Sequence, residues 1–68
     1  MITFKLEGDY IPLIQLLKAV NVVEHGGEAQ AVVSEGLVSC NGVQEFRKRY
    51  KVKKGDIIEF FQHKIVVE

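Results

Sequence analysis

The residues best suited to chemistry in this sequence are cations that lie close together. Six of them fall within eight residues, with no acid among them; this basic segment, residues 47–54, contains Arg47, Lys48, Arg49, Lys51, Lys53 and Lys54. Such a run repels itself, and a phosphate backbone offsets that cost while releasing its own counterions. Arginine holds phosphate bidentately, whereas lysine acts as a point charge. The segment therefore predicts a polyanion-binding surface or, alternatively, a solvated edge strand whose lysines discourage aggregation.

Two uncharged residues of the basic segment leave its conformation open. Tyr50 can stack on an unpaired base. Equally, Tyr50 and Val52 can point inward and pack against a sheet.

Few other residues offer chemistry. Cys40, His25 and His63 lack the spacing of a metal site, so we expect no bound metal. Cys40 alternates with Ser39 and is expected in the core, while His63 is expected in a turn. A chain of 68 residues has little room for a deep, water-excluding pocket, so we do not expect an enzyme or a cofactor.

The charge is distributed unevenly along the chain. The formal net charge is zero, but residues 1–30 contain two lysines and four acids, and residues 31–68 contain seven Lys or Arg and five acids. No signal peptide or membrane span is recognisable, and a single cysteine fits a reducing compartment. We expect one domain over residues 1–68, a monomer in the cytoplasm without membrane contact.

Hydrophobic periodicity predicts the elements of the first half. Alternation from Ile2 to Glu7 is typical of a strand with one buried face. Apolar residues at helical spacing predict a helix from about Ile11 to Val20, with Asp9 as a candidate cap and Pro12 in its first turn. Asn21 is suited to a left-handed end.

A second helix and a run of strands follow. Ala29, Val32 and Val33 mark the apolar side of a short helix that Gly36 can terminate, after a turn at residues 24–27. Asn41-Gly42 predicts a hairpin between residues 37–40 and 43–46, because both turn positions require positive φ. Residues 57–61 and 64–67 are expected to be strands, which gives an α+β fold.

Several of these features, taken in order, resemble a known family. They are Glu28-Ala29, Val32-Val33, Gly36, Val38, Cys40-Asn41-Gly42, the basic segment and Gly55-Asp56-Ile57-Ile58-Glu59-Phe60. The family is the RNA-binding domain of small-subunit ribosomal protein four, the alpha-L motif, and the chain looks most like its short stand-alone bacterial members. The resemblance covers about Leu13 to Phe60. It implies two short helices packed on a small, bent antiparallel sheet, and non-catalytic binding of structured RNA of the ribosomal or transfer type.

The resemblance also implies where the RNA would bind. The start of the second helix would contribute His25, Gly26, Gly27 and Gln30, and the glycine pair would let backbone N–H groups approach a phosphate. The six cations of the basic segment would form the rest of the surface. Lys18 on the first helix is a further candidate.

Some positions depart from the family's pattern. Gln30, Ser34 and Pro12 stand where a basic residue is usual or frequent, and Cys40 replaces a valine. The helix side of the expected surface therefore carries less charge. This motivates an alternative, in which the chain is a protein-interaction adaptor that uses the same charged surface, with a partner on a ribonucleoprotein and with RNA binding weak or lost.

Overall fold

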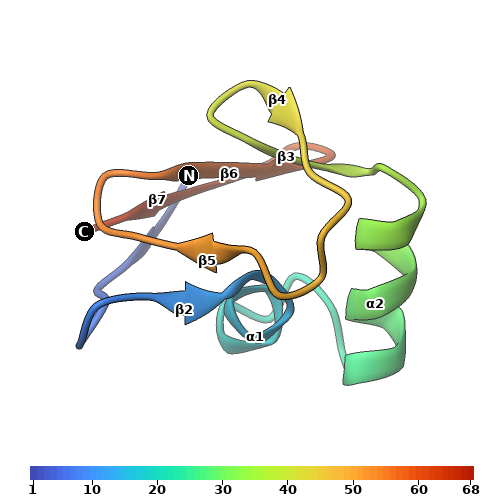
Figure 1. Ribbon diagram of the computed structural model, residues 1–68, viewed down its shortest axis with the longest axis horizontal. Helices are drawn as coiled ribbons and strands as arrows, with labels where there is room; N and C mark the ends of the chain where they lie inside the picture. Colours follow the sequence, from blue (N-terminus) through green and yellow to red (C-terminus); the bar gives the residue numbers. More distant parts are fainter.

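The computed structural model describes all 68 residues and contains two helices and seven short strands (Figure 1). The helices are α1 (Leu13–Ala19) and α2 (Gly26–Ser34). The strands are β1 (Ile2–Phe4), β2 (Ile11–Pro12), β3 (Val38–Cys40), β4 (Val43–Gln44), β5 (Lys51–Val52), β6 (Ile57–Phe60) and β7 (His63–Val67). The α+β class expected from the sequence is confirmed.

Five strands form one sheet in the order β1-β7-β6-β3-β4. All neighbours are antiparallel except β1, which pairs in parallel with β7 and places Thr3 opposite Val66. The expectation of a purely antiparallel sheet is therefore wrong at this edge. A parallel pair needs a long crossover connection, and the chain between β1 and β7, which contains both helices, supplies one.

A second, two-stranded sheet was not expected. β2 pairs antiparallel with β5, with Ile11 opposite Val52 and Pro12 opposite Lys51. The predicted start of the first helix at Ile11 is therefore wrong, because residues 11–12 are extended and α1 begins at Leu13. Pro12 is the N-cap, with φ −60° and ψ 142°, and no side chain caps this helix, so Asp9 does not.

Both helices end in the same left-handed motif. After α1, Asn21 has φ 60°, its N–H donates to the Lys18 carbonyl, and the Val22 N–H donates to the Leu17 carbonyl. After α2, Gly36 has φ 75°, and the N–H groups of residues 36 and 37 donate to the carbonyls of residues 33 and 32. These two pairs of bonds define the Schellman motif, so both predicted helix ends are confirmed.

The predicted hairpin forms between β3 and β4 and is tied to a second turn. Asn41 and Gly42 have φ 52° and 85°, as a two-residue hairpin turn requires. The Asn41 side chain accepts from the Ile57 N–H at 2.9 Å and donates to Asp56 at 3.1 Å. Asp56 in turn accepts from the Lys53 N–H at 2.9 Å. The hairpin turn thereby fixes the end of the basic segment.

One apolar core joins the helices to one face of the larger sheet. Ile58 and Phe60 of β6 are buried while Glu59 between them is exposed, which is the pattern of a sheet covered on one side. Leu13, Leu16 and Leu17 of α1 pack into the same cluster of 15 buried residues, and no polar or charged residue is buried. Neither helix is long or apolar enough to span a membrane.

The end of α2 gives a stability prediction. A Cβ at Gly36 would lie 2.8 Å from both Gln44 Nε2 and Phe46 Cε1, and Gln44 cannot move without losing its 2.8 Å bond to the Gly36 carbonyl. Gly36→Ala should therefore lose about 1–2 kcal/mol from left-handed strain and about 1–3 kcal/mol more from overpacking. Urea denaturation measures the loss.

Gly8→Ala is the matched control for this substitution. Gly8 also has positive φ (+92°), but nothing lies within 4 Å of its added Cβ. Gly8→Ala should therefore be destabilised by the backbone strain alone, with no steric clash. Equal destabilisation by the two substitutions would contradict the packing argument.

Candidate nucleic-acid interface

The backbone of the basic segment is bonded to the start of α1. The Leu13 N–H donates to the Tyr50 carbonyl at 2.9 Å, and the Ile14 N–H donates to the Lys48 carbonyl at 3.2 Å. These carbonyls satisfy donors that a helix N-terminus otherwise leaves unpaired, and no side chain does so here. Together with the β2–β5 pairing, they hold the basic segment against α1 without using any of its cations.

All six cations of the basic segment are exposed, whereas Val52 is completely buried. Tyr50 is half-buried and packs against the core, with the Arg47 guanidinium 5.1 Å from its ring centre. Partial burial raises the pKa of the Tyr50 phenol. Of the two orientations open from the sequence, the structure shows Tyr50 and Val52 packing inward.

One of the six cations already has an acidic partner. Arg47 and Glu45 form a bidentate pair, with Nε 2.9 Å from Oε2 and Nη2 3.0 Å from Oε1. Hydrogen bonds from Arg47 lower the pKa of the Glu45 carboxyl. This is the only ion pair in the structure. Five cations of the segment therefore lack an acidic partner, and Arg47 is the one least available to a ligand.

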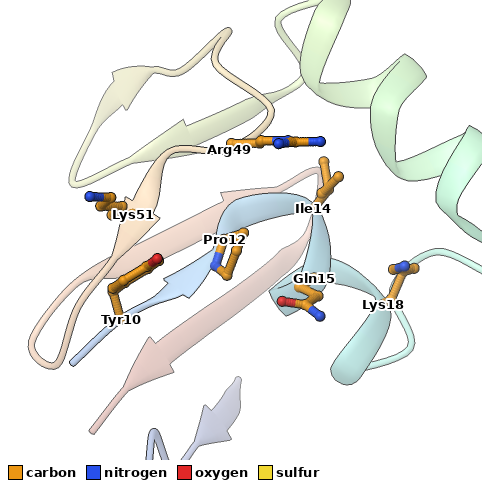
Figure 2. A pocket seen from close by; sticks show the side chains of 7 residues that line it. All are labelled: Tyr10, Pro12, Ile14, Gln15, Lys18, Arg49 and Lys51. Atoms are coloured by element: carbon orange, nitrogen blue, oxygen red, sulfur yellow. The ribbon is translucent and has the colours of Figure 1, made fainter. Parts of the chain in front are cut away.

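Four of the six exposed cations of the basic segment line two open grooves, which share Arg49 and Lys51. The groove of about 440 Å³ shown in Figure 2 runs between the basic segment and the start of α1. Its lining residues are Tyr10, Pro12, Ile14, Gln15, Lys18, Arg49 and Lys51. The second groove, of about 370 Å³, is lined by Arg47, Arg49, Tyr50, Lys51 and Lys53. Arg49 and Lys51 thus form a cationic ridge between the grooves.

Lys18 connects the first groove to the start of α2. Besides lining the groove, its Nζ lies 3.8 Å from the position that a Cβ on Gly26 would occupy. Figure 2 shows Lys18 at the end of the groove opposite Tyr10. The structure therefore places Lys18, Arg49 and Lys51 along the same groove, which their sequence positions do not indicate.

The start of α2 differs from the turn expected at residues 24–27. The helix begins at Gly26, and His25 is its N-cap, whose Nδ1 accepts from the Glu28 N–H at 3.3 Å. Glu28 accepts from the Glu24 N–H at 2.7 Å. The N–H groups of Gly26 and Gly27 have no partner within the chain, so they stay available to an anion.

Not every candidate residue lies in a groove. His25, Gly26, Gly27 and Gln30 line neither groove, and Gln30 is exposed one helical turn after Gly26. Lys48 and Lys54 are exposed outside both.

Tyr10 is the residue of this site that sequence reasoning missed. It is 46% exposed, it lines the first groove, and Lys51 Nζ lies 5.0 Å from its ring centre. Its position follows from the pairing of β2 with β5. Two-residue strands carry no measurable periodicity, so the only signal in the sequence was an aromatic residue two positions before a proline.

Comparison with known proteins shows the family of this chain. The family model described as S4 domain matches residues 4–68. The chain belongs to the S4 domain family. This S4 domain is 35% identical over 68 residues to the YbcJ proteins of Escherichia coli (strain K12) and Shigella flexneri, covering 98% of this chain and 97% of each relative.

The S4 domain is also similar to a solved structure. The solution structure of E. coli YbcJ, described as revealing an alpha-L motif involved in RNA binding, matches with a TM-score of 0.77 and 35% identity. The match covers 98% of this chain and 86% of that one. The family and the alpha-L fold implied by the resemblance are therefore confirmed.

The thiol of this S4 domain lies away from the grooves. Cys40 is 6% exposed and belongs to the core, as expected. Burial, with smaller contributions from Asp56 and Glu45, raises its pKa to about 12. No group of three or more His, Cys, Asp or Glu is placed to hold a metal ion.

This burial predicts an unreactive thiol. Only the thiolate is nucleophilic, so Cys40 should resist iodoacetamide at pH 8 in the folded protein and react readily in urea. Burial also makes stability depend on pH, because the pKa of Cys40 is higher in the folded protein than in the unfolded chain. Below pH 9.0 the thiol is protonated in both states and does not affect the free energy of unfolding. As the pH rises from 9.0 toward about 12, only the unfolded chain loses this proton, so the free energy of unfolding should fall. Mass spectrometry measures the alkylation, and rapid reaction of the folded protein would contradict the buried placement.

Proposed function

We propose that this S4 domain is a non-catalytic RNA-binding protein that contacts structured RNA, of the ribosomal or transfer type, through the basic segment and Lys18. Residues 1–68 act as a single domain, as a monomer in the cytoplasm. The observation that carries the proposal is that five exposed cations of the basic segment have no acidic partner. Two of them, Arg49 and Lys51, line one groove together with Lys18. Family membership and the description of the YbcJ structure support it.

Phosphate is the ligand that suits this surface best. Arg49 can hold a phosphate bidentately, and lysines beside it add charge without demanding a fixed orientation. The cationic ridge has a groove on each side, so the backbone of a folded RNA can follow it on either flank. Double-stranded RNA is recognised mainly through shape and backbone contacts, and this surface offers such contacts.

The absence of catalysis is also part of the proposal. Both grooves are open, and the one thiol of the chain is buried and protonated at neutral pH. General acid–base or nucleophilic chemistry works best in a site that excludes water. The exposed lysines and arginines are arranged instead to neutralise charge.

Removing one cation of the ridge and one of the second groove tests the RNA surface. The double variant Arg49→Gln/Lys53→Gln should bind a labelled RNA stem-loop roughly 10- to 100-fold more weakly, because two phosphate contacts and their counterion release are lost. Fluorescence anisotropy measures the affinity. The matched control is Lys5→Gln/Lys64→Gln, which removes the same charge from exposed lysines outside both grooves. Equal weakening by both variants would contradict a localised surface.

The salt dependence gives a second, independent measurement. With about five phosphate contacts, the logarithm of the association constant should fall with the logarithm of salt concentration with a slope on the order of −4. The Arg49/Lys53 variant should reduce that slope by about two, since each lost phosphate contact removes about one. A slope near zero in the wild type would argue against backbone recognition.

The adaptor expected from the sequence would use the same charged surface, but the observation that favours a protein partner is an apolar surface elsewhere. Around the β3–β4 hairpin, Val43 is 69% exposed and Phe46 is 55% exposed, with Leu37 nearby in sequence and also exposed. Exposed apolar side chains of this kind favour contact with a protein. A pull-down partner that survives nuclease treatment and is lost in Val43→Ser/Phe46→Ser would support this function, whereas a partner lost with the RNA would oppose it.

A further inference from the structure

We infer that the groove between Tyr10 and Lys18 holds one unpaired nucleotide of the bound RNA, with its base stacked on Tyr10 and its phosphates on Arg49 and Lys18. The inference rests on the proposed function and adds to it a ligand class at a defined subsite. It goes beyond backbone recognition, because it requires a base that has left its helix.

The lining of this groove differs from that of a simple phosphate site. Its cations face Tyr10, Pro12 and Ile14, and no carboxylate lines it. A phosphate alone needs only cations, whereas a nucleotide presents an apolar ring face and an anionic backbone together. The groove's volume of about 440 Å³ lies in the range of roughly 300–1,000 Å³ that accommodates small organic ligands.

Tyr10 is suited to be the stacking platform. It is 46% exposed although Lys51 lies over its ring, so aromatic surface is left for a base. Ile11 and Pro12, which follow it, are paired with β5, and this pairing limits the movement of the ring. Aromatic stacking tolerates any base, because every base has a π-face. Tyr50 lines the second groove rather than this one, and it is partly buried against the core with the Arg47 guanidinium 5.1 Å from its ring centre.

The order of the lining residues along the groove would place the base and the phosphates of the nucleotide at different positions. Figure 2 shows Tyr10 and Lys51 at one end, Lys18 at the other, and Arg49 extending above Ile14 between them. A base on Tyr10 would therefore direct its phosphates toward Arg49 and Lys18. Beyond Lys18 lies Gly26, whose N–H is free, so the backbone can continue toward the start of α2.

Fluorescence of 2-aminopurine tests this subsite. An RNA stem-loop carries the analogue in its unpaired loop, and a blunt duplex of the same stem serves as the second ligand. In Tyr10→Ala, the affinity for the stem-loop should fall about 5- to 100-fold, and the quenching of 2-aminopurine should be lost. The affinity for the duplex and its salt dependence should be unchanged, because the basic segment is intact.

Two variants serve as controls. Tyr10→Phe keeps the ring and should keep both affinity and quenching. Phe61→Ala removes another exposed aromatic side chain, 69% exposed and outside both grooves, and should behave as the wild type. Circular dichroism confirms that each variant is folded.

The outcomes separate this inference from the proposed function. If the wild type binds both RNAs and Tyr10→Ala loses nothing, or loses equally on both, the nucleotide subsite is overturned while RNA binding stands. If the wild type binds neither RNA, both are overturned. Adenosine monophosphate is titrated in parallel, and free nucleotide binding as strongly as the stem-loop would overturn RNA as the source of the nucleotide.

Discussion

The attachment of the basic segment to the start of α1 is the interaction on which this S4 domain's surface depends. Pro12 offers no capping side chain, so the carbonyls of Lys48 and Tyr50 accept the first N–H groups of α1. Six neighbouring cations would otherwise separate by mutual repulsion. Because backbone groups alone make this attachment, no cation is used in it. The segment is held in place while its charged side chains project into solvent.

Sequence reasoning predicted the parts of the fold that rest on strong local signals. Asn21 and Gly36 end their helices as their conformational preferences require, and Asn41-Gly42 forms the hairpin. It did not predict β2 and β5, whose two residues each are too few to show a period. The alternation of β1 identified a strand but carried no information about its partner, so the parallel pairing with β7 was missed.

The candidate site was likewise predicted from the sequence only in part. The exposure of the six cations follows from their density, which no core could accommodate. Their grouping does not follow, because Lys18 and Tyr10 meet Arg49 and Lys51 only through the β2–β5 register and the backbone bonds from α1 to the basic segment. The pairing of Arg47 with Glu45 is local by contrast, because Glu45 lies two residues before the start of the acid-free run. Long-range pairing determines which charges are neighbours, and a single sequence encodes it weakly.

The parallel edge of the sheet has a consequence for synthesis on the ribosome. β1 pairs only with β7, and the Leu6 N–H donates to the Glu68 carbonyl while the Glu68 N–H donates to the Phe4 carbonyl. A nascent chain therefore keeps its first strand unpaired until residues 65–68 have emerged. Because contacts so distant in sequence form slowly, we expect the β1–β7 pairing to form late in folding, and the apolar residues Ile2 and Phe4 lack their partner strand until it does.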